Sequence, residues 1–381
     1  MKILHITPAY KPAFVYGGPT LSVSQLCEHQ AAIGNEVTVV TTTANGNAEL
    51  EEGEAVVEGV KVYYFKRLTK DHTHLSPALL IFLWRNSRQF DTIHIHSWWN
   101  LVSVLATLVC YLKGITPVLS PRGMLSNFSF VNSNSIKKRL IHRGGGKFLL
   151  RKTRLHATSL LEWSDAHRIN KQWPGFVLPN IIDLPNHEFA RSASTDTLKL
   201  VFLSRIHAKK GLELTLEALS NVSFPFQLEI YGDGEEEYVK SLKALATTVG
   251  IDQAILWKGW VSGEAKYRAL SGGDVFILTS YNENFANVVL ESLAVGTPAL
   301  ISDQVGMCDY VKQTGAGWVC ETSVESIVST LNNAYRLRNK ITVNINKVYD
   351  DFDGRNVSEQ YSREYQRWGK ASSADYRYSH V

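Results

Sequence analysis

Glu283 and Glu291 are two carboxylates whose spacing could serve the binding of a sugar and a phosphate. Glu283 stands in a polar turn after the apolar run Val275–Leu278, and Glu291 stands inside a helix predicted over 286–295. The first N–H groups of a helix lack intrahelical partners and favour anions. A phosphate could bind at this helix start while the carboxylates accept hydroxyl groups on either side. The alternative is that both are solvated surface charges.

A second segment, 204–211, carries two cations next to a predicted helix start. Arg205 precedes this helix and Lys210 begins it. Cations are unusual there because the first turn of a helix already carries partial positive charge. A bound anion would compensate, and a diphosphate leaving group needs about two positive charges. The pair therefore indicates a diphosphate site that works without a metal ion.

The first half of the chain offers a glycine pair at a matching position. Gly17 and Gly18 follow a predicted strand at 2–7 and precede a helix at 20–33. Two glycines allow a ligand to approach the backbone closely, although an ordinary turn would also use them. Their spacing differs from the G-x-G-x-x-G pattern of nicotinamide-binding proteins.

Two histidines share one face of the strand predicted at 92–96. His96 falls at the carboxyl end, where sites lie in parallel sheets, whereas His94 lies deeper and is expected to be a core residue. The pair could bind a metal ion, but no third ligand is obvious nearby, so we expect none. Trp98 could stack on an acceptor sugar or could simply pack.

Arg122 lies in a turn after the strand predicted at 117–120 and is expected to point into a cleft. It could pair with a phosphate or with an anionic acceptor, and a structural ion pair is the alternative. Residues 137–154 contain nine Lys, Arg or His among apolar positions. This segment could rest on an anionic membrane as a peripheral contact or bind a lipid diphosphate, or it could be a solvated basic face.

The elements that would position these residues alternate between strand and helix in both halves of the chain. This order predicts an α/β fold with two Rossmann-like, doubly wound domains that face each other across a cleft. The expected divisions are an acceptor-side domain at 1–188, a donor-binding domain at 189–354, a helix at 355–371 that crosses back to the first domain, and a tail at 372–381.

Composition narrows the class of protein. A chain of 381 residues with 44% hydrophobic and 20% charged residues is typical of soluble globular proteins. It contains no apolar run of the roughly 20 residues that span a bilayer. The absence of a signal peptide and four widely spaced cysteines predict a cytoplasmic protein without zinc or disulfides. The basic segment lacks a base-stacking platform, so nucleic-acid binding is not expected.

At this point the motifs resemble a known family. R-I-H-A-K-K-G resembles R-x4-K-G, and E-N-F-A-N-V-V-L-E-S-L-A-V-G-T-P resembles the E-x7-E signature of retaining glycosyltransferases of family GT4. I-H-I-H-S, S-P-R-G-M-L, H-A-T-S-L-L-E and V-L-P-N-I-I-D resemble elements of members concerned with surface polysaccharides. The similarity runs from Met1 to about Trp318 and implies the GT-B fold, a nucleotide-sugar donor and a glycan or lipid-linked glycan acceptor.

The resemblance also implies roles for particular residues. Arg205 and Lys210 would hold the donor diphosphate, Glu291 the ribose hydroxyls and Glu283 the hexose hydroxyls. The remaining donor contacts would come from a backbone approach at Gly17 and Gly18, a base site near Gly232 and Trp260, and the segment Asn284, Phe285, Ala286 and Asn287. His96 would line the reaction centre, and Arg122 and Trp98 would lie on the acceptor side.

The resulting hypothesis is retaining, metal-independent transfer of a hexose from an NDP-sugar, with UDP favoured over GDP. The nucleotide-sugar is a substrate, so no cofactor is expected. The family's G-F-G is N-F-A here, and the bulk of Asn284 and Ala286 is expected to decide which donor fits. Two alternatives remain open, namely a nucleotide-sugar epimerase on the same fold and a non-catalytic sugar-binding protein.

Overall fold

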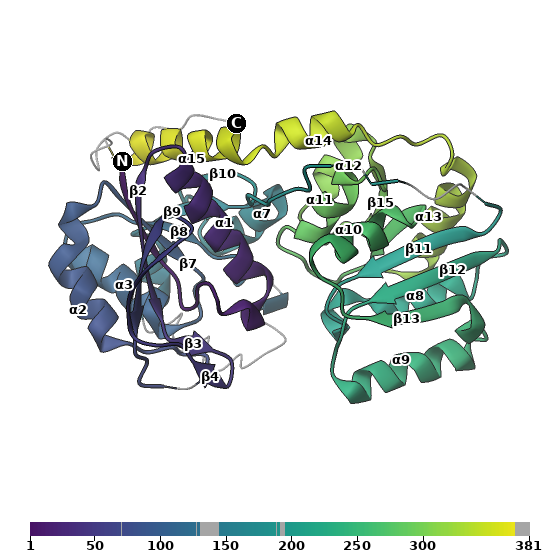
Figure 1. Cartoon of the computed structure of the whole chain (residues 1–381), viewed down its shortest axis with the longest axis horizontal. Coiled ribbons are helices and arrows are strands. Elements are labelled where there is room, and N and C mark those ends of the chain that lie inside the picture. The colour runs from purple at the N-terminus through teal and green to yellow at the C-terminus, as the bar shows by residue number, and fades with distance from the viewer. Residues whose placement is uncertain (70, 127, 130–144, 188, 191–194, 370–381) are drawn as a thin grey trace. The chain divides into compact units, whose positions relative to one another are not determined.

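The chain forms two compact units, which we describe separately from a computed structural model. The first contains Met1–Asp183 and the residues from Phe352 on, and the second is Leu184–Asp351. The structure describes residues 1–69, 71–126, 128–129, 145–187, 189–190 and 195–369 (Figure 1). The expected tail and the first part of the basic segment, 137–144, lie outside the described residues.

The first unit is built on an eight-stranded sheet in the order β10-β9-β8-β7-β1-β2-β6-β5. Its neighbouring strands are parallel, apart from β5 against β6. The acidic stretch 49–54 contains the end of β4 and the start of β5. The strands are β1 (Lys2–Ile6), β2 (Glu36–Thr42), β5 (Gly53–Val57), β6 (Val60–Phe65), β7 (Thr92–His96), β8 (Val118–Ser120), β9 (Arg154–Ala157) and β10 (Gly175–Val177), with a hairpin of β3 (Ala44–Asn45) and β4 (Ala48–Glu49).

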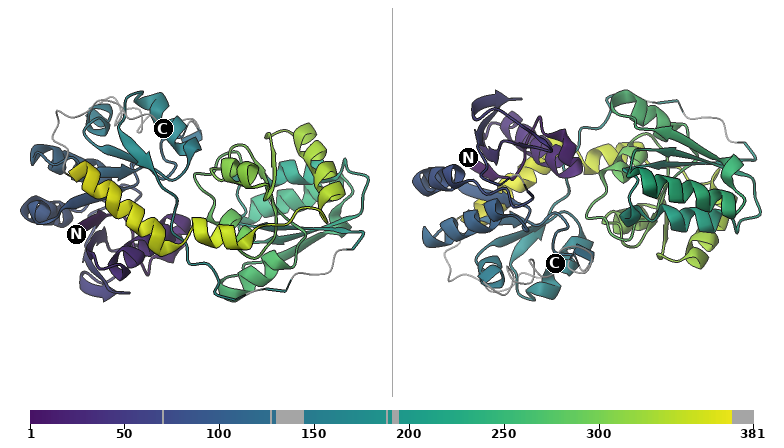
Figure 2. Two further views of the ribbon diagram at one scale, coloured as in Figure 1. Left: turned by 90° about the horizontal axis from the view of Figure 1, so that it is seen from above. Right: turned by 90° about the horizontal axis from the view of Figure 1, so that it is seen from below.

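Helices cover both faces of this sheet (Figures 1 and 2). Because side chains alternate along a strand, Leu4 and Ile6 of β1 pack in the core with α2 and α3, whereas Ile3 packs with α1 and α15. The helical elements are η1 (Phe14–Tyr16), α1 (Gly18–Ala32), α2 (Pro77–Asn86), η2 (Ser87–Gln89), α3 (Leu101–Leu112), α6 (Lys147–Leu150), α7 (Leu160–Ile169) and α15 (Gly354–Gly369). The last helix therefore belongs to the core of the first unit.

The second unit is a six-stranded, fully parallel sheet in the order β13-β12-β11-β14-β15-β16. The strands are β11 (Leu198–Leu203), β12 (Phe226–Tyr231), β13 (Ile255–Gly259), β14 (Val275–Leu278), β15 (Ala299–Ser302) and β16 (Gly317–Cys320). The helical elements are η4 (Ala208–Lys210), α8 (Leu212–Leu219), α9 (Glu236–Thr248), η5 (Asp252–Ala254), α10 (Gly263–Ser271), α11 (Asn287–Ala294), α12 (Cys308–Thr314), α13 (Val324–Leu337) and α14 (Ile345–Asp351).

Each sheet has one point at which the strand order reverses, and ligands bind at such points in doubly wound folds. In the first unit the chain winds outward in opposite directions from β1 and β7. In the second unit it does so from β11 and β14. His96 ends β7, and the loops after β1, β11 and β14 contain Gly17, Arg205 and Glu283. Topology thus brings these four predicted site residues to the reversal points.

No helix in the described part of the chain is long and apolar enough to cross a membrane.

Candidate functional site

The loop between β11 and α8 gathers three cations at the reversal point of the second unit. Arg205 is exposed, whereas Lys209 and Lys210 on η4 are largely shielded from solvent. The pKa of Lys209 is lowered, first by burial and further by repulsion from Lys210 and Arg205, while Glu283 acts in the opposite sense. The cations therefore lie close enough to repel one another, and a bound anion would relieve that repulsion.

A glycine makes this loop possible. Gly211 adopts a φ of +63°, and a Cβ atom there would lie 2.2 Å from the carbonyl oxygen of Thr279 at the end of β14. No side chain fits that distance, so glycine lets the two loops approach. The backbone N–H of Tyr281 also donates to the Lys209 carbonyl over 2.9 Å.

Lys210 and Glu283 meet directly across these two loops. The Lys210 Nζ lies 2.8 Å from a carboxylate oxygen of Glu283, and both side chains are at least four-fifths buried, with 16% and 14% exposed. The Glu283 backbone is fixed as well, because its N–H donates to Gln304 and its carbonyl accepts from Gly306. An ammonium group has three donors, so Lys210 keeps capacity for a phosphate while it contacts Glu283.

Glu291 has a different lysine partner, which sequence reasoning missed. Lys266 of α10 lies 2.7 Å from one carboxylate oxygen of Glu291, whose side chain is only 6% exposed. Both helices pack together, so the pair joins the first turn of α10 to the middle of α11. The sequence signal for this partner was charge complementarity to a buried glutamate, but no local pattern links two residues that lie 25 positions apart. The remaining lone pairs of Glu291 are available for hydroxyl groups.

Between the two glutamates, the backbone at the start of α11 is strained. Ala286 is the residue before the helix and has φ +67° and ψ +75°, a left-handed conformation that glycine favours. An L-residue pays roughly 1–2 kcal/mol there. The N-cap residue Ala286 makes no side-chain cap hydrogen bond to this helix. Such strain gathers at binding sites, which fits the expected contacts of Asn284, Phe285 and Asn287 with a donor.

The two residues expected near a nucleotide base lie at the carboxyl ends of neighbouring strands. Gly232 follows β12, with φ +142°, and a Cβ there would lie 1.9 Å from the Ser204 carbonyl oxygen. Trp260 follows β13 and is 63% exposed. A large exposed indole beside a tightly packed backbone turn could stack on a planar base.

In the first unit, Gly17 and Gly18 begin α1 as expected. Gly17 caps the helix with φ +68°, and space is open around the Cα atoms of both glycines. The helix has no side-chain cap and no acidic residue in its first turn. Its N–H groups thus lie at the carboxyl edge of the sheet, beside the end of β7.

The histidines of β7 are more deeply placed than the sequence suggested. His94 and His96 point to one face, as predicted, and both are fully buried. They are joined by His5, the neighbour of His94 across the β1–β7 pair. The three residues form a group whose ligand atoms lie within 4.8 Å of one another. The third histidine that sequence reasoning failed to find therefore exists, 89 positions from His94.

These histidines are nevertheless committed to hydrogen bonds. His5 bonds to His96 over 2.9 Å and to Gln30 over 2.8 Å. His94 bonds to Tyr365 over 2.7 Å and to Ser120 over 2.6 Å. The second nitrogen of His96 faces Arg122. Each ring nitrogen thus has a protein partner, and a metal ion would have to replace these bonds.

Arg122 lies over this histidine group in a left-handed conformation, with φ +52°. Its Nε donates to His96 over 3.3 Å, and one terminal nitrogen donates to Ser22 and Asn180 over 3.0 Å each. In the described part of the chain it forms no ion pair, so the structural alternative raised by the sequence does not apply. A buried guanidinium on neutral acceptors attracts an anion.

Glu162 holds the turn that carries Arg122 and was not singled out from the sequence. Its carboxylate accepts from the N–H of Gly123 over 2.7 Å and from the N–H of Thr158 over 2.8 Å. Burial raises the pKa of Glu162, while these N–H groups and the charge of Arg122 oppose that rise.

Trp98 does not fulfil the expectation of a sugar platform. Its side chain is fully buried in the core that contains α3. Ser97 before it has φ +70°, and this turn directs the indole inward. The packing alternative is therefore correct for Trp98.

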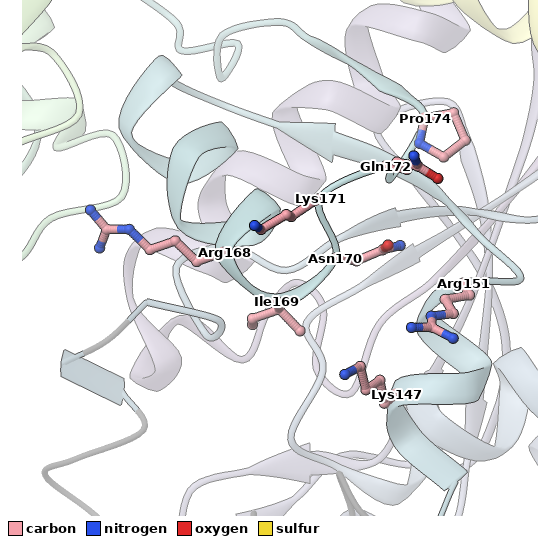
Figure 3. A pocket seen from close by; sticks show the side chains of 8 residues that line it. All are labelled: Lys147, Arg151, Arg168, Ile169, Asn170, Lys171, Gln172 and Pro174. Atoms are coloured by element: carbon pink, nitrogen blue, oxygen red, sulfur yellow. The ribbon is translucent and has the colours of Figure 1, made fainter. Parts of the chain in front are cut away.

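A separate basic pocket lies at the opposite, amino edge of the first sheet, where β9 and β10 begin. It encloses about 700 Å³, and in Figure 3 Lys147 of α6 and Arg151, the residue after α6, lie across from Lys171. Arg168 pairs with Asp165, whereas the other three cations have no ion-pair partner in the described residues. The lining residues are Lys147, Arg151, Arg168, Ile169, Asn170, Lys171, Gln172 and Pro174.

Two parallel-sheet units with sites at their reversal points define a GT-B type fold. Comparison with solved structures agrees: HepE from Anabaena, in complex with UDP-glucose, superposes with a TM-score of 0.71 at 16% identity, covering 96% of this chain and 100% of that one.

Sequence comparison identifies the family. Residues 17–180 match the glycosyl transferase 4-like domain and residues 185–348 match glycosyl transferases group 1. An uncharacterized glycosyltransferase of Methanocaldococcus jannaschii is 22% identical over 94% of this chain and 96% of its own length. The lipopolysaccharide core biosynthesis glycosyltransferase LpsE of Rhizobium meliloti is 32% identical over 29% of this chain and 31% of its own. The chain belongs to the GT4-like, group 1 glycosyltransferases.

Proposed function

We propose that this glycosyltransferase moves a hexose from an NDP-sugar to an acceptor hydroxyl with retention of configuration and without a metal ion. The observation that carries this proposal is the Lys210–Glu283 pair beside Arg205, at the reversal point of the second unit. Cations, a carboxylate that can bind hydroxyl groups and a helix start without a side-chain cap occur together there. A donor needs all three, for its diphosphate and for its sugar.

The chemistry follows from the charges. In the transition state the bond between the sugar's anomeric carbon and the phosphate oxygen breaks, and negative charge grows on the diphosphate. Arg205, Lys210 and the start of α11 would stabilise that charge. Both carboxylates already face lysines, which favours hydroxyl binding over a metal ion. The acceptor oxygen would attack from the side that the diphosphate leaves, and its proton would pass to a phosphate oxygen.

Relatives support the choice of donor and pathway. The neighbour HepE is described in complex with UDP-glucose, and LpsE is named for lipopolysaccharide core biosynthesis. We therefore favour UDP over GDP and an acceptor in surface polysaccharide or glycolipid assembly.

A transfer assay separates this proposal from its rivals. The purified chain is incubated with UDP-hexoses, with and without a lipid-linked glycan fraction, and products are analysed by NMR. Acceptor-dependent release of UDP, with the donor's anomeric configuration kept in the product, is expected. An isomerised nucleotide-sugar formed without acceptor would indicate an epimerase, and nucleotide-sugar binding without turnover would indicate a non-catalytic protein.

The basic pocket supports a second proposal, peripheral contact with an anionic membrane. Lys147, Arg151 and Lys171 leave an exposed positive surface, and Phe148 beside them is 47% exposed. Cations flanked by an exposed aromatic ring suit a lipid headgroup surface. Charge reversal in Lys147→Glu/Arg151→Glu should abolish binding to vesicles that contain phosphatidylglycerol. The matched control, Lys240→Glu/Lys340→Glu in the second unit, should bind as the wild type does. Equal binding by both variants would remove the proposal.

A further inference from the structure

An unbroken chain of hydrogen bonds connects the last helix to Arg122 through the interior of the first unit. It runs through side chains that lie far apart in the sequence, and it ends at a backbone carbonyl. Its eight bonds join, in order, Arg122, His96, His5, Gln30, Tyr365, His94, Ser120, His156 and the Leu178 carbonyl, at 3.3, 2.9, 2.8, 3.3, 2.7, 2.6, 2.5 and 3.0 Å.

The direction of donation is fixed at the Arg122 end. A guanidinium N–H can only donate, so Nδ1 of His96 must accept. A neutral His96 then carries its proton on Nε2 and donates to Nδ1 of His5. His5 in turn donates from Nε2 to the carbonyl oxygen of Gln30. The amide group of Gln30 is left to donate to the Tyr365 hydroxyl.

The direction is fixed independently at the other end. A carbonyl oxygen can only accept, so Nε2 of His156 donates to Leu178. Nδ1 of His156 must then accept from Ser120, and Ser120 accepts from Nε2 of His94. Nδ1 of His94 is left to accept from the Tyr365 hydroxyl. Both ends therefore require the same roles of Tyr365: it accepts from Gln30 and donates to His94.

The donor and acceptor roles in this series of hydrogen bonds require all four histidines to be neutral, and burial in the interior keeps them neutral. Burial lowers the pKa of His5 to about 4 and that of His156 to about 3, and it lowers the pKa of His94 and of His96 well below the ordinary value. The charge of Arg122 acts in the same direction on each of them. The result is a guanidinium held by His96, Ser22 and Asn180 without any opposing charge from them.

We propose that Tyr365 is a positioning residue for Arg122. By accepting from Gln30 and donating to His94, it joins the two halves of the hydrogen-bond chain, whose ends fix the proton positions, and so holds His96 in place as a neutral acceptor of the guanidinium. The charge of Arg122 is then left for an anionic oxygen group of a substrate. The inference that a substrate supplies this anionic group rests on the proposed function, whereas the positions of the protons on the histidines do not. Either the acceptor or the donor diphosphate could supply the anionic group, and kinetics distinguish them.

The proton positions are tested without any substrate. Long-range ¹H–¹⁵N NMR of the full chain at pH 7 should show His5, His94, His96 and His156 as neutral rings protonated on Nε2. The Arg122 Nε–H signal should exchange slowly with water. In Tyr365→Phe this signal should be lost or broadened. A ring protonated on Nδ1, a charged ring, or an unchanged Arg122 signal in Tyr365→Phe would overturn the proposal.

The control is Tyr361→Phe, one turn earlier on α15. Tyr361 is as buried as Tyr365 and contacts Nε2 of His156. Without the Tyr361 hydroxyl, His156 still donates to the Leu178 carbonyl, so the series of hydrogen bonds stays intact. Gln30→Leu, on α1, also removes the hydrogen bond between Gln30 and Tyr365. It replaces Tyr365→Phe as the test variant if Tyr365→Phe fails to fold.

Steady-state kinetics complete the test. Tyr365→Phe should raise one substrate's KM about tenfold, the scale of one hydrogen bond to a charged group, with Tyr361→Phe within about twofold of wild type. A rise in acceptor KM identifies the acceptor as the anion, and a rise in donor KM identifies the diphosphate. Equal effects of both variants would show a purely structural role. If the wild type transfers no sugar, the proposed function fails while the NMR result still decides the proton positions.

Discussion

The Nζ atom of Lys210 lies 2.8 Å from the carboxylate of Glu283, although the two residues come from separate loops 73 positions apart. This contact joins the two motifs that define the second unit's candidate site. The R-x4-K-G motif supplies the cations and the E-x7-E motif supplies the carboxylates. In the proposed function, the pair would link the diphosphate and sugar ends of one donor site.

Loss of either cation at this site should impair turnover. Lys210→Ala and Arg205→Ala should each lower kcat by about 10²–10³-fold, the usual effect of removing one donor to developing charge. Lys240→Ala, an exposed lysine on α9 paired with Glu236, is the control and should retain wild-type kcat. Steady-state UDP release measures all three. Near-normal turnover in both site variants would refute the assignment of the diphosphate site.

The Lys266–Glu291 pair should couple stability to nucleotide binding. Lys266→Met leaves Glu291 buried without its partner, which should lower the free energy of unfolding by roughly 3–5 kcal/mol. The double variant Lys266→Met/Glu291→Leu should recover much of that stability but should not bind nucleotide, because no carboxylate remains for the ribose. Urea unfolding and calorimetric titration with UDP measure these effects. Wild-type nucleotide affinity in the double variant would contradict the role of Glu291.

Ala286 should tolerate glycine better than its neighbours in the helix do. Ala286→Gly removes a left-handed strain of roughly 1–2 kcal/mol, which offsets the entropy cost of glycine, so stability should be unchanged or slightly higher. Ala294→Gly, a buried helical position in α11, should lose about 1 kcal/mol. Thermal unfolding compares the two. Because Ala286→Gly also adds room beside Asn284, it should broaden donor choice among UDP-hexoses, and unchanged donor preference would argue against a specificity role.

The buried histidines should make the first unit sensitive to acid. Their folded pKa values lie below the unfolded value of 6.5, reaching about 4 for His5, because burial and Arg122 disfavour the charged form. The unfolded chain therefore binds more protons, so stability is complete above about pH 6.5 and falls as the pH drops toward 4. Each histidine contributes about 1.4 kcal/mol per pH unit in that range. Hydrogen exchange of β7 amides at pH 7 and 5.5 measures this loss, and equal protection at both values would contradict it.

The order of elements and the turn motifs were enough to predict the two-domain α/β fold, whereas the roles of the candidate site residues stay predictions. Alternating apolar strands and helices indicated two parallel sheets, and His94 and His96 shared a face because strand side chains alternate. The R-x4-K-G motif and the motif around Glu283 placed the cations and Glu283 in two loops that the structure brings together.

Residues that act across the fold could not be predicted in the same way. Lys266 meets Glu291 only because α10 packs on α11, and His5 meets His96 only because β1 lies beside β7. Tyr365 reaches His94 from a helix 271 positions away. The sequence left Trp98 open between stacking and packing, and the structure buries it. No local pattern marks the left-handed turn at the preceding Ser97.

The most direct test of the donor site is the stability that nucleotides confer on the full chain. UDP at about 100 times its Kd should raise the free energy of unfolding by about 2.7 kcal/mol, and GDP at the same concentration should raise it less. Arg205→Ala/Lys210→Ala should show little or no shift with UDP, while Lys240→Ala should match the wild type. No stabilisation by any nucleoside diphosphate, or an equal shift in the double variant, would contradict the account.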